Sequence, residues 1–152
     1  MFAIGVDIGG TKCAVCLGRP SENHVEIVHK CPPHATASGS PQEMVRLLAS
    51  DVRTCIALSP ERPVGIGISC GGPLDSRTGR ILSPPNLPGW DQVPVTEYFT
   101  SRFGVPCFLQ NDADACAVAE WSFGAGRGCD NMVFLTFGTG FGAGLILGGR
   151  LY

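Results

Sequence analysis

The chain of 152 residues is long enough to bury a substantial core and fits one domain or slightly more. Its hydrophobic content of 44%, with 16% charged residues, is typical of a globular protein and not of a disordered one. A formal net charge of −2, without any run of lysine or arginine, argues against a nucleic-acid partner. No apolar stretch is long enough to span a bilayer and the N-terminus does not resemble a signal peptide, so we expect a cytoplasmic protein with no membrane partner.

The first third of the chain reads as three strands followed by a helix. The strands are predicted over residues 2–7, 12–17 and 25–29. A polar loop over 31–39 leads to a helix start, where Ser40 and Glu43 form a capping box and Pro41 occupies the first helical position. Apolar residues at helical spacing continue this helix to residue 56.

The rest of the chain alternates strands with helices. We predict strands over residues 64–70, 105–110, 132–136 and 144–147, a polar hairpin around 75–79, helices over 95–103 and 113–121, and a flexible link over 124–128. This order predicts an α/β fold with a mixed sheet covered by helices. The strand, glycine turn and strand near the end of the chain repeat the pattern at its start.

Two glycine-rich turns follow apolar strands, and each is itself followed by a strand, whereas a dinucleotide-binding fingerprint opens a helix. Glycine lets a backbone approach a ligand closely, and successive N–H groups in such a turn form a concave anion site. Each turn alone also reads as a tight hairpin connection, but the pair predicts a polyphosphate held between them. An aspartate in the first turn suits magnesium, bound directly or through water. The expected nucleotide-binding residues are Asp7 (also the metal ligand), Gly9, Gly10, Thr11, Lys12, Thr136, Gly138, Thr139 and Gly140.

Eight cysteines raise the question of a metal or redox site. Cys13 and Cys16 have the spacing of half a zinc site, but residues three apart on a strand point to opposite faces. The sequence has no second pair of this kind to complete a site. Most of the cysteines lie in apolar runs, so we expect reduced, buried thiols.

Five motifs, in order along the chain, resemble those of the ROK family (repressors, open reading frames and kinases) and most of all its glucokinase-type sugar kinases. The matching segments are Gly5-Val6-Asp7-Ile8-Gly9-Gly10-Thr11-Lys12, Gly65-Ile66-Gly67-Ile68-Ser69-Cys70-Gly71-Gly72-Pro73, Pro85-Asn86-Leu87-Pro88-Gly89-Trp90, Gln110-Asn111-Asp112-Ala113-Asp114-Ala115 and Thr136-Phe137-Gly138-Thr139-Gly140-Phe141-Gly142. The resemblance implies a ribonuclease-H-like (actin-like ATPase) fold. It assigns residues 1–123 to an N-terminal sugar-binding lobe, and 124–152 to a link and the first hairpin of an incomplete C-terminal lobe.

The resemblance also implies a catalytic residue, Asp112, which would act as the general base on a sugar hydroxyl. A helix N-terminus favours its anionic form, although aspartate at such a position also serves as an N-cap. Asn86 would contact sugar hydroxyls, although in its proline-rich loop it also reads as a turn residue. The substrate-binding residues implied are Gly71, Gly72, Asn86, Asn111 and Asp112.

The function implied is ATP-dependent phosphorylation of a hexose, glucose first, at the 6-hydroxyl, with ATP and magnesium. Two alternatives stay open: a sugar-sensing regulator of the same family without its DNA-binding segment, and a non-catalytic fragment. The family's structural zinc site and most of its adenosine pocket lie in a C-terminal half that this chain does not include, so we expect residues 1–152 alone to be inactive. The terminal hairpin has an apolar face that should seek a partner, which predicts a homo-oligomer, a dimer.

Overall fold

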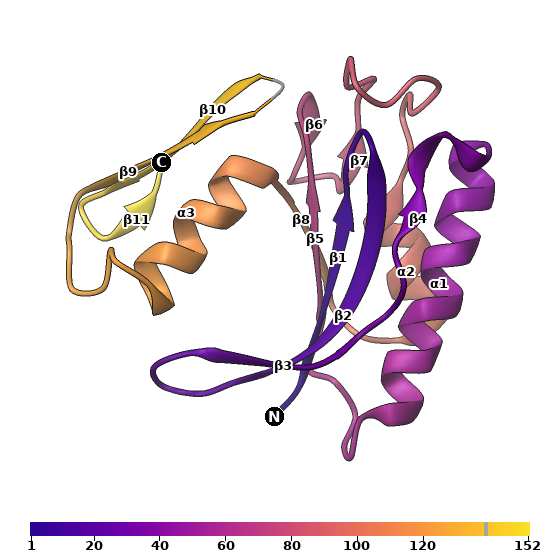
Figure 1. The fold of residues 1–152 in the computed structure, drawn as a ribbon, viewed down its shortest axis with the longest axis horizontal. Coiled ribbons are helices and arrows are strands. Elements are labelled where there is room, and N and C mark those ends of the chain that lie inside the picture. Colours follow the sequence, from indigo (N-terminus) through magenta and orange to yellow (C-terminus); the bar gives the residue numbers. More distant parts are fainter. Residues whose placement is uncertain (139) are drawn as a thin grey trace.

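A mixed β-sheet forms the centre of the computed structural model, which describes residues 1–138 and 140–152 (Figure 1). Its strands are β1 (Ala3–Ile8), β2 (Lys12–Pro20), β3 (Val25–Lys30), β4 (His34–Ala35), β5 (Ile66–Cys70) and β8 (Cys107–Asn111). The order across the sheet is β3-β2-β1-β5-β8, and β4 pairs with β2. β1 is antiparallel to β2 but parallel to β5, which is parallel to β8. This confirms the predicted α/β fold with a mixed sheet.

Two helices, α1 (Pro41–Leu58) and α2 (Val95–Phe103), lie against this sheet and form the core with it (Figure 1). Leu17 from β2, Leu48 from α1 and Phe99 from α2 are fully buried there. The predicted capping box opens α1, since the Ser40 hydroxyl accepts the Glu43 N–H while the Glu43 carboxylate accepts the Ser40 N–H at 2.7 Å. No helix in the described part of the chain combines the length and apolarity needed to cross a membrane.

A second, three-stranded sheet packs on helix α3 (Asp112–Phe123) at the other side of the molecule (Figure 1). Its strands are β9 (Met132–Phe137), β10 (Phe141–Leu147) and β11 (Arg150–Leu151), in the order β11-β10-β9. Gly144 makes this packing close, because a Cβ atom there would lie 2.5 Å from the Ala117 Cβ and 2.6 Å from the Ala113 carbonyl oxygen. The helix therefore carries the terminal hairpin.

Several element bounds differ from the prediction. The expected polar loop over 31–39 contains β4 and a 3₁₀ turn over Thr36–Ser38, because this segment pairs with the distant start of β2. β10 begins at Phe141, three residues earlier than expected, and α3 begins at Asp112 and ends at Phe123. The polar hairpin is present as β6 (Leu74–Asp75) and β7 (Arg80–Ile81).

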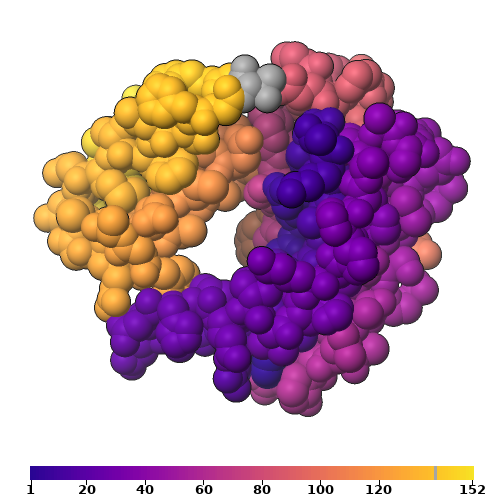
Figure 2. Space-filling view, in the orientation of Figure 1, coloured from indigo at the N-terminus to yellow at the C-terminus, as the bar shows by residue number. Residues whose placement is uncertain are grey.

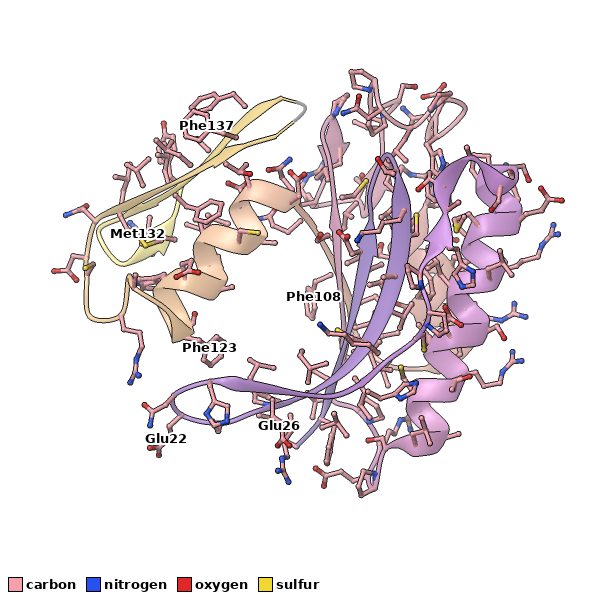
Figure 3. All side chains as sticks on the ribbon, in the orientation of Figure 1. Glu22, Glu26, Phe108, Phe123, Met132 and Phe137 are labelled. Atoms are coloured by element: carbon pink, nitrogen blue, oxygen red, sulfur yellow. The ribbon has the colours of Figure 1, made fainter. Side chains whose placement is uncertain are left out.

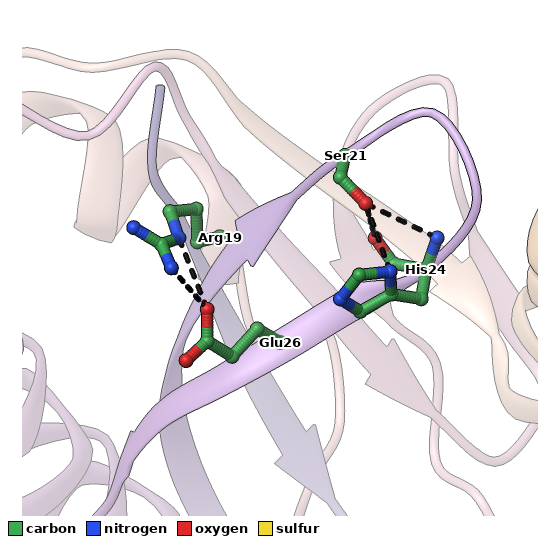
Figure 4. A network of polar contacts seen from close by, with 4 residues as sticks. All are labelled: Arg19, Ser21, His24 and Glu26. Carbon is green, nitrogen blue, oxygen red and sulfur yellow. Dashed lines mark hydrogen bonds and ion pairs between the residues drawn. The ribbon is translucent and has the colours of Figure 1, made fainter.

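The β2–β3 hairpin projects from the sheet and is held at the surface by polar contacts (Figure 4). Arg19 Nε donates to Glu26 Oε2 at 3.0 Å across the two strands. At the turn, the Ser21 hydroxyl donates to the His24 carbonyl oxygen at 2.9 Å. All of these atoms are exposed, so the contacts contribute little to stability and serve to order the hairpin.

Candidate active site

The carboxyl ends of three parallel strands meet at one edge of the main sheet. In the register of β1, β5 and β8, Asp7 lies beside Ser69, and Ser69 beside Gln110. The next row continues with Cys70 beside Asn111. This edge is where open α/β sheets bind ligands, because polar side chains and loop backbone converge there.

Four of the predicted sugar-site residues lie together just beyond this edge. A Cβ atom at Gly71 would be 3.9 Å from Asp112 Oδ2, and one at Gly72 would be 3.6 Å from Asn111 Nδ2. The two glycines therefore lie directly beside the two polar side chains, with no side chain of their own between them. A ligand at this point would meet an amide, a carboxylate and exposed backbone at once.

Asp112 is the first residue of α3, and its side chain is exposed. The N-cap of this helix is Asn111, whose side-chain oxygen accepts from the N–H groups of Ala113 at 3.0 Å and Asp114 at 3.4 Å. The sequence left open that Asp112 is only the cap, and the structure gives that role to its neighbour. Asp112 Oδ1 accepts from the Ala113 N–H at 2.9 Å, which leaves Oδ2 beside Gly71.

Thr36, which sequence reasoning did not single out, holds the first glycine turn by two hydrogen bonds. The Thr36 hydroxyl donates to the Gly9 carbonyl oxygen at 2.6 Å, and its N–H donates to the Thr11 carbonyl oxygen at 3.0 Å. Within the turn, the Gly9 N–H donates to the Lys12 carbonyl oxygen at 3.1 Å. No local pattern pointed to Thr36, since it lies 27 residues from Gly9 in the chain.

The first glycine turn also touches the proline-rich loop that carries Asn86. A Cβ atom at Gly10 would lie 2.8 Å from the Asn86 Cβ and 2.9 Å from its carbonyl oxygen. Only a glycine fits against the loop at this distance. A residue predicted for the nucleotide and one predicted for the sugar are therefore in direct contact.

Asp7 presents an exposed carboxylate that Ser69 orients, because the Ser69 hydroxyl donates to Asp7 Oδ1 at 2.8 Å. In residues 1–138 and 140–152, no group of three or more His, Cys, Asp or Glu side chains could hold a metal. A single carboxylate fits magnesium, which keeps several waters and takes one or two carboxylates together with substrate phosphates. The donor set therefore suits the predicted ion and would not suit a structural zinc ion.

Cys70, buried at the end of β5, lies near both carboxylates of the site. Burial, followed by the charge of Asp112, the nearby Cys13 and then the charge of Asp7, raises the pKa of the Cys70 thiol to about 12. The thiol therefore stays protonated and is not a nucleophile. All eight cysteines are free, as the sequence predicted, but the expected burial is only partly confirmed, since Cys116 and Cys129 are exposed. Cys13 is buried in the core while Cys16 lines a cleft on the opposite face of its strand.

That cleft has a volume of about 640 Å³ and opens between the main sheet, the β2–β3 hairpin and α3 (Figure 2). Its polar part is formed by Asp7, Lys12, Lys30, Ser69 and Gln110, and the remaining lining is largely apolar. Phe108 of β8 is 70% exposed and, like Phe123 at the end of α3, faces this opening (Figure 3). The cleft has the size of a small-molecule site, and Asp7, Ser69 and Gln110 of the strand edge line it. The residues predicted for the sugar do not line it: Gly71, Gly72, Asn86, Asn111 and Asp112.

The second glycine turn connects β9 and β10, and its described residues do not line this cleft. The Gly138 N–H donates to the Gly140 carbonyl oxygen at 2.9 Å, and Thr136 is exposed at the end of β9. Thr139, the fourth residue predicted here, lies outside the described residues. None of Thr136, Gly138 and Gly140 lines the cleft that Asp7 and Lys12 line.

Comparison with known proteins links this arrangement to one family. The sequence model that describes the ROK family matches residues 3–152 of the chain. The glucokinase of Thermotoga maritima is 37% identical over 97% of the chain, and the xylose repressor of Caldicellulosiruptor bescii is 28% identical over 98%. A solved ROK glucokinase from Streptomyces griseus, in complex with glucose and AMPPNP, has a TM-score of 0.84 and 32% identity over the whole chain. The chain spans less than half the length of each of these proteins: 45% of the first, 37% of the second and 46% of the third.

Proposed function

The chain belongs to the ROK family and has the fold of its sugar kinases, and from this premise we propose that it is the N-terminal part of an ATP-dependent hexose kinase. Glucose is the proposed substrate and the 6-hydroxyl the proposed acceptor. In this proposal residues 1–123 are the sugar-binding lobe, and 124–152 are a link and the first hairpin of a second lobe. The protein would act in carbohydrate metabolism in the cytoplasm.

The observation that carries this proposal is the position of Asp112. Its Oδ2 lies beside Gly71, and its neighbour Asn111 lies beside Gly72. Asn111 ends β8 and Asp112 follows it, and β5 alone separates β8 from the Asp7 strand β1. Phosphoryl transfer needs mainly positioning and charge stabilisation, so a carboxylate within reach of a bound hydroxyl is the main chemical group required.

In the proposed mechanism, Asn86, Asn111 and the backbone of the two adjacent glycines hold the sugar. Asp112 would accept the proton of the 6-hydroxyl as the hydroxyl oxygen attacks the γ-phosphorus of ATP. The bond from that phosphorus to the bridging oxygen breaks, and ADP leaves. Magnesium bound near Asp7 would supply charge neutralisation on the phosphates. Both glycine turns would bind the triphosphate, one from each side, through their N–H groups and through side chains such as Thr11 and Lys12.

The family also supports a second candidate function, a sugar-responsive regulator, because the xylose repressor of Caldicellulosiruptor bescii matches nearly all of the chain. A regulator needs sugar binding but no general base. The third candidate, a non-catalytic fragment, is favoured by the share of its relatives that the chain spans. We therefore propose that residues 1–152 alone do not phosphorylate sugar and that the intact gene product does.

The intact gene product should phosphorylate glucose when supplied with ATP and magnesium, with a higher kcat/KM than for mannose, fructose or N-acetylglucosamine. ³¹P NMR of the product identifies the 6-phosphate, and a coupled assay gives the rates. Removing magnesium with EDTA should abolish the reaction. If no hexose is phosphorylated and a gel shift detects specific binding to promoter DNA, the protein is a regulator and the kinase proposal is wrong.

We also propose that the 152-residue chain forms a homodimer through the outer face of the terminal hairpin. Val133, Leu135, Phe137 and Phe141 share that face and are 58%, 47%, 78% and 66% exposed. Light scattering at high concentration should give the mass of a dimer, and Leu135→Glu should give a monomer because it places a charge in the interface. Phe108→Ser, at an exposed apolar side chain elsewhere, is the matched control and should stay dimeric. A monomeric wild-type chain would contradict the proposal.

A further inference from the structure

The segment that precedes α1 braces the first glycine turn against the body of the molecule. β4 pairs with the start of β2, with Ala35 opposite Lys12 and His34 opposite Cys13. His34 Nε2 lies 2.7 Å from Asp51 Oδ2 of α1, and both side chains are largely buried. The segment is therefore fixed to the longest helix on one side and to the turn-bearing hairpin on the other.

Thr36 is the point at which this segment meets the turn. It is 8% exposed, the one buried polar residue in the described part of the chain. A hydroxyl has a single hydrogen to donate, and the Gly9 carbonyl oxygen can only accept, so the 2.6 Å contact uses that hydrogen. The Thr36 oxygen remains free to accept from the Cys13 thiol, 3.4 Å away. The side chain is thus satisfied by contacts within the fold and points at the turn, away from solvent.

The bond to the Gly9 oxygen fixes the orientation of a whole peptide unit. The Gly9–Gly10 peptide is trans, and in a trans peptide the C=O and the following N–H point in opposite directions. Anchoring the Gly9 oxygen toward Thr36 therefore directs the Gly10 N–H to the opposite side of the turn. That N–H has no acceptor among residues 1–138 and 140–152.

A pair of glycines is the sequence least able to hold a peptide plane by itself, because both residues accept many backbone conformations. An N–H binds an anion more tightly when it already points at the site before the anion arrives, because less ordering is then needed. Thr36 supplies the constraint that the Gly9–Gly10 pair lacks.

We propose that Thr36 is a positioning residue for nucleotide binding: its hydroxyl fixes the Gly9–Gly10 peptide so that the Gly10 N–H faces a phosphate of ATP. The proposal rests on the proposed kinase function. Thr36 itself contacts neither phosphate nor sugar. Its effect should therefore fall on the nucleotide and not on the sugar.

The test compares three variants of the intact gene product with the wild type. Thr36→Val keeps the shape and the backbone N–H but loses the hydroxyl, and Thr36→Ser keeps the hydroxyl. Thr54→Val is the matched control, since the Thr54 hydroxyl bonds only within α1, to the Ser50 carbonyl oxygen. Calorimetry with AMPPNP and magnesium should give a Kd about 10-fold higher for Thr36→Val, as expected for one lost hydrogen bond, and a wild-type Kd for the other two variants. The KM for ATP should rise in the same way, while the KM for glucose stays unchanged.

A second measurement reads the turn directly. In protein labelled with [¹⁵N]glycine, the Gly10 amide should show lower order by heteronuclear NOE in Thr36→Val, and wild-type order in Thr36→Ser. If Thr36→Val does not fold, Thr36→Ala takes its place, with thermal unfolding as the check. If the wild type binds AMPPNP and Thr36→Val binds it equally well, the role of Thr36 is overturned and the kinase function stays intact. The same conclusion follows if Gly10 is equally ordered in Thr36→Val. A wild-type protein that binds no nucleotide would instead overturn the kinase function and, with it, the phosphate assigned to Gly10.

Discussion

Replacing Asp112 by asparagine in the intact gene product should lower kcat for glucose by roughly 10²- to 10⁴-fold, the usual contribution of a general base. Asparagine keeps the size of the side chain and its place beside Gly71, but its amide cannot accept the proton of the sugar hydroxyl. The Kd for glucose should change little, because only the transition state loses the interaction. Steady-state kinetics and calorimetry with glucose measure the two effects separately.

Asp114→Asn is the matched control for this experiment. Asp114 lies in the same first turn of α3, and burial, followed by the charge of Asp112, raises the pKa of its carboxyl. The Asp114 N–H donates to the side-chain oxygen of Asn111, but the Asp114 side chain is not among the groups proposed to contact the sugar. The Asp114→Asn variant should therefore keep a kcat near the wild-type value. Equal rates for Asp112→Asn and wild type would remove Asp112 from the mechanism, and equal losses in both variants would indicate a general effect of charge at this helix end.

Replacing Gly10 by alanine should weaken glucose binding, although Gly10 belongs to the turn predicted for the nucleotide. The new methyl group would lie 2.8 Å from the Asn86 Cβ and 2.9 Å from its carbonyl oxygen, so the sugar loop or the turn must shift. A forced shift of this kind costs about 1–3 kcal/mol, which corresponds to a loss of roughly 5- to 150-fold in kcat/KM for glucose. Calorimetry with glucose in the absence of ATP shows whether the loss falls on the sugar site itself.

Gly67→Ala provides the comparison for that variant. Gly67 lies in β5, and a Cβ atom there would meet no heavy atom within 4 Å, so the substitution adds the same methyl group without a clash. Its Kd for glucose should match the wild type. If Gly10→Ala also binds glucose as the wild type does and only the KM for ATP rises, then the contact between the two loops does not couple the sites.

The features that the sequence predicted well are those fixed by neighbouring residues. The capping box at Ser40 and the bounds of the helix over 95–103 depend on residues within a turn or two of each other, and both are confirmed. The position of Asn111 and Asp112 at the end of a strand follows in the same way, from an apolar run that meets a helix start. Local order along the chain was sufficient for these elements, whereas the sugar-site residues came from the family resemblance and their roles stay predictions.

The features that the sequence did not reveal depend on residues far apart in the chain. β4 exists only because it pairs with the start of β2, and the bond from Thr36 to Gly9 joins residues 27 apart. The contact of Gly10 with Asn86 likewise arises from the fold, since either segment alone reads as an ordinary turn. The choice of Asn111 over Asp112 as the N-cap depended on a shift of one residue at the helix boundary. Such bounds are the least determined part of any local pattern.

Helix α3 has one further consequence for how the molecule could move. Its first residue is Asp112, and its first two turns press Ala113 and Ala117 against Gly142 and Gly144 of the second sheet. Because the two backbones pack this closely, we expect the helix and that sheet to move together as one rigid unit. A hinge motion that moves the terminal hairpin would therefore also move the Asp112 carboxylate and change its position relative to the sugar.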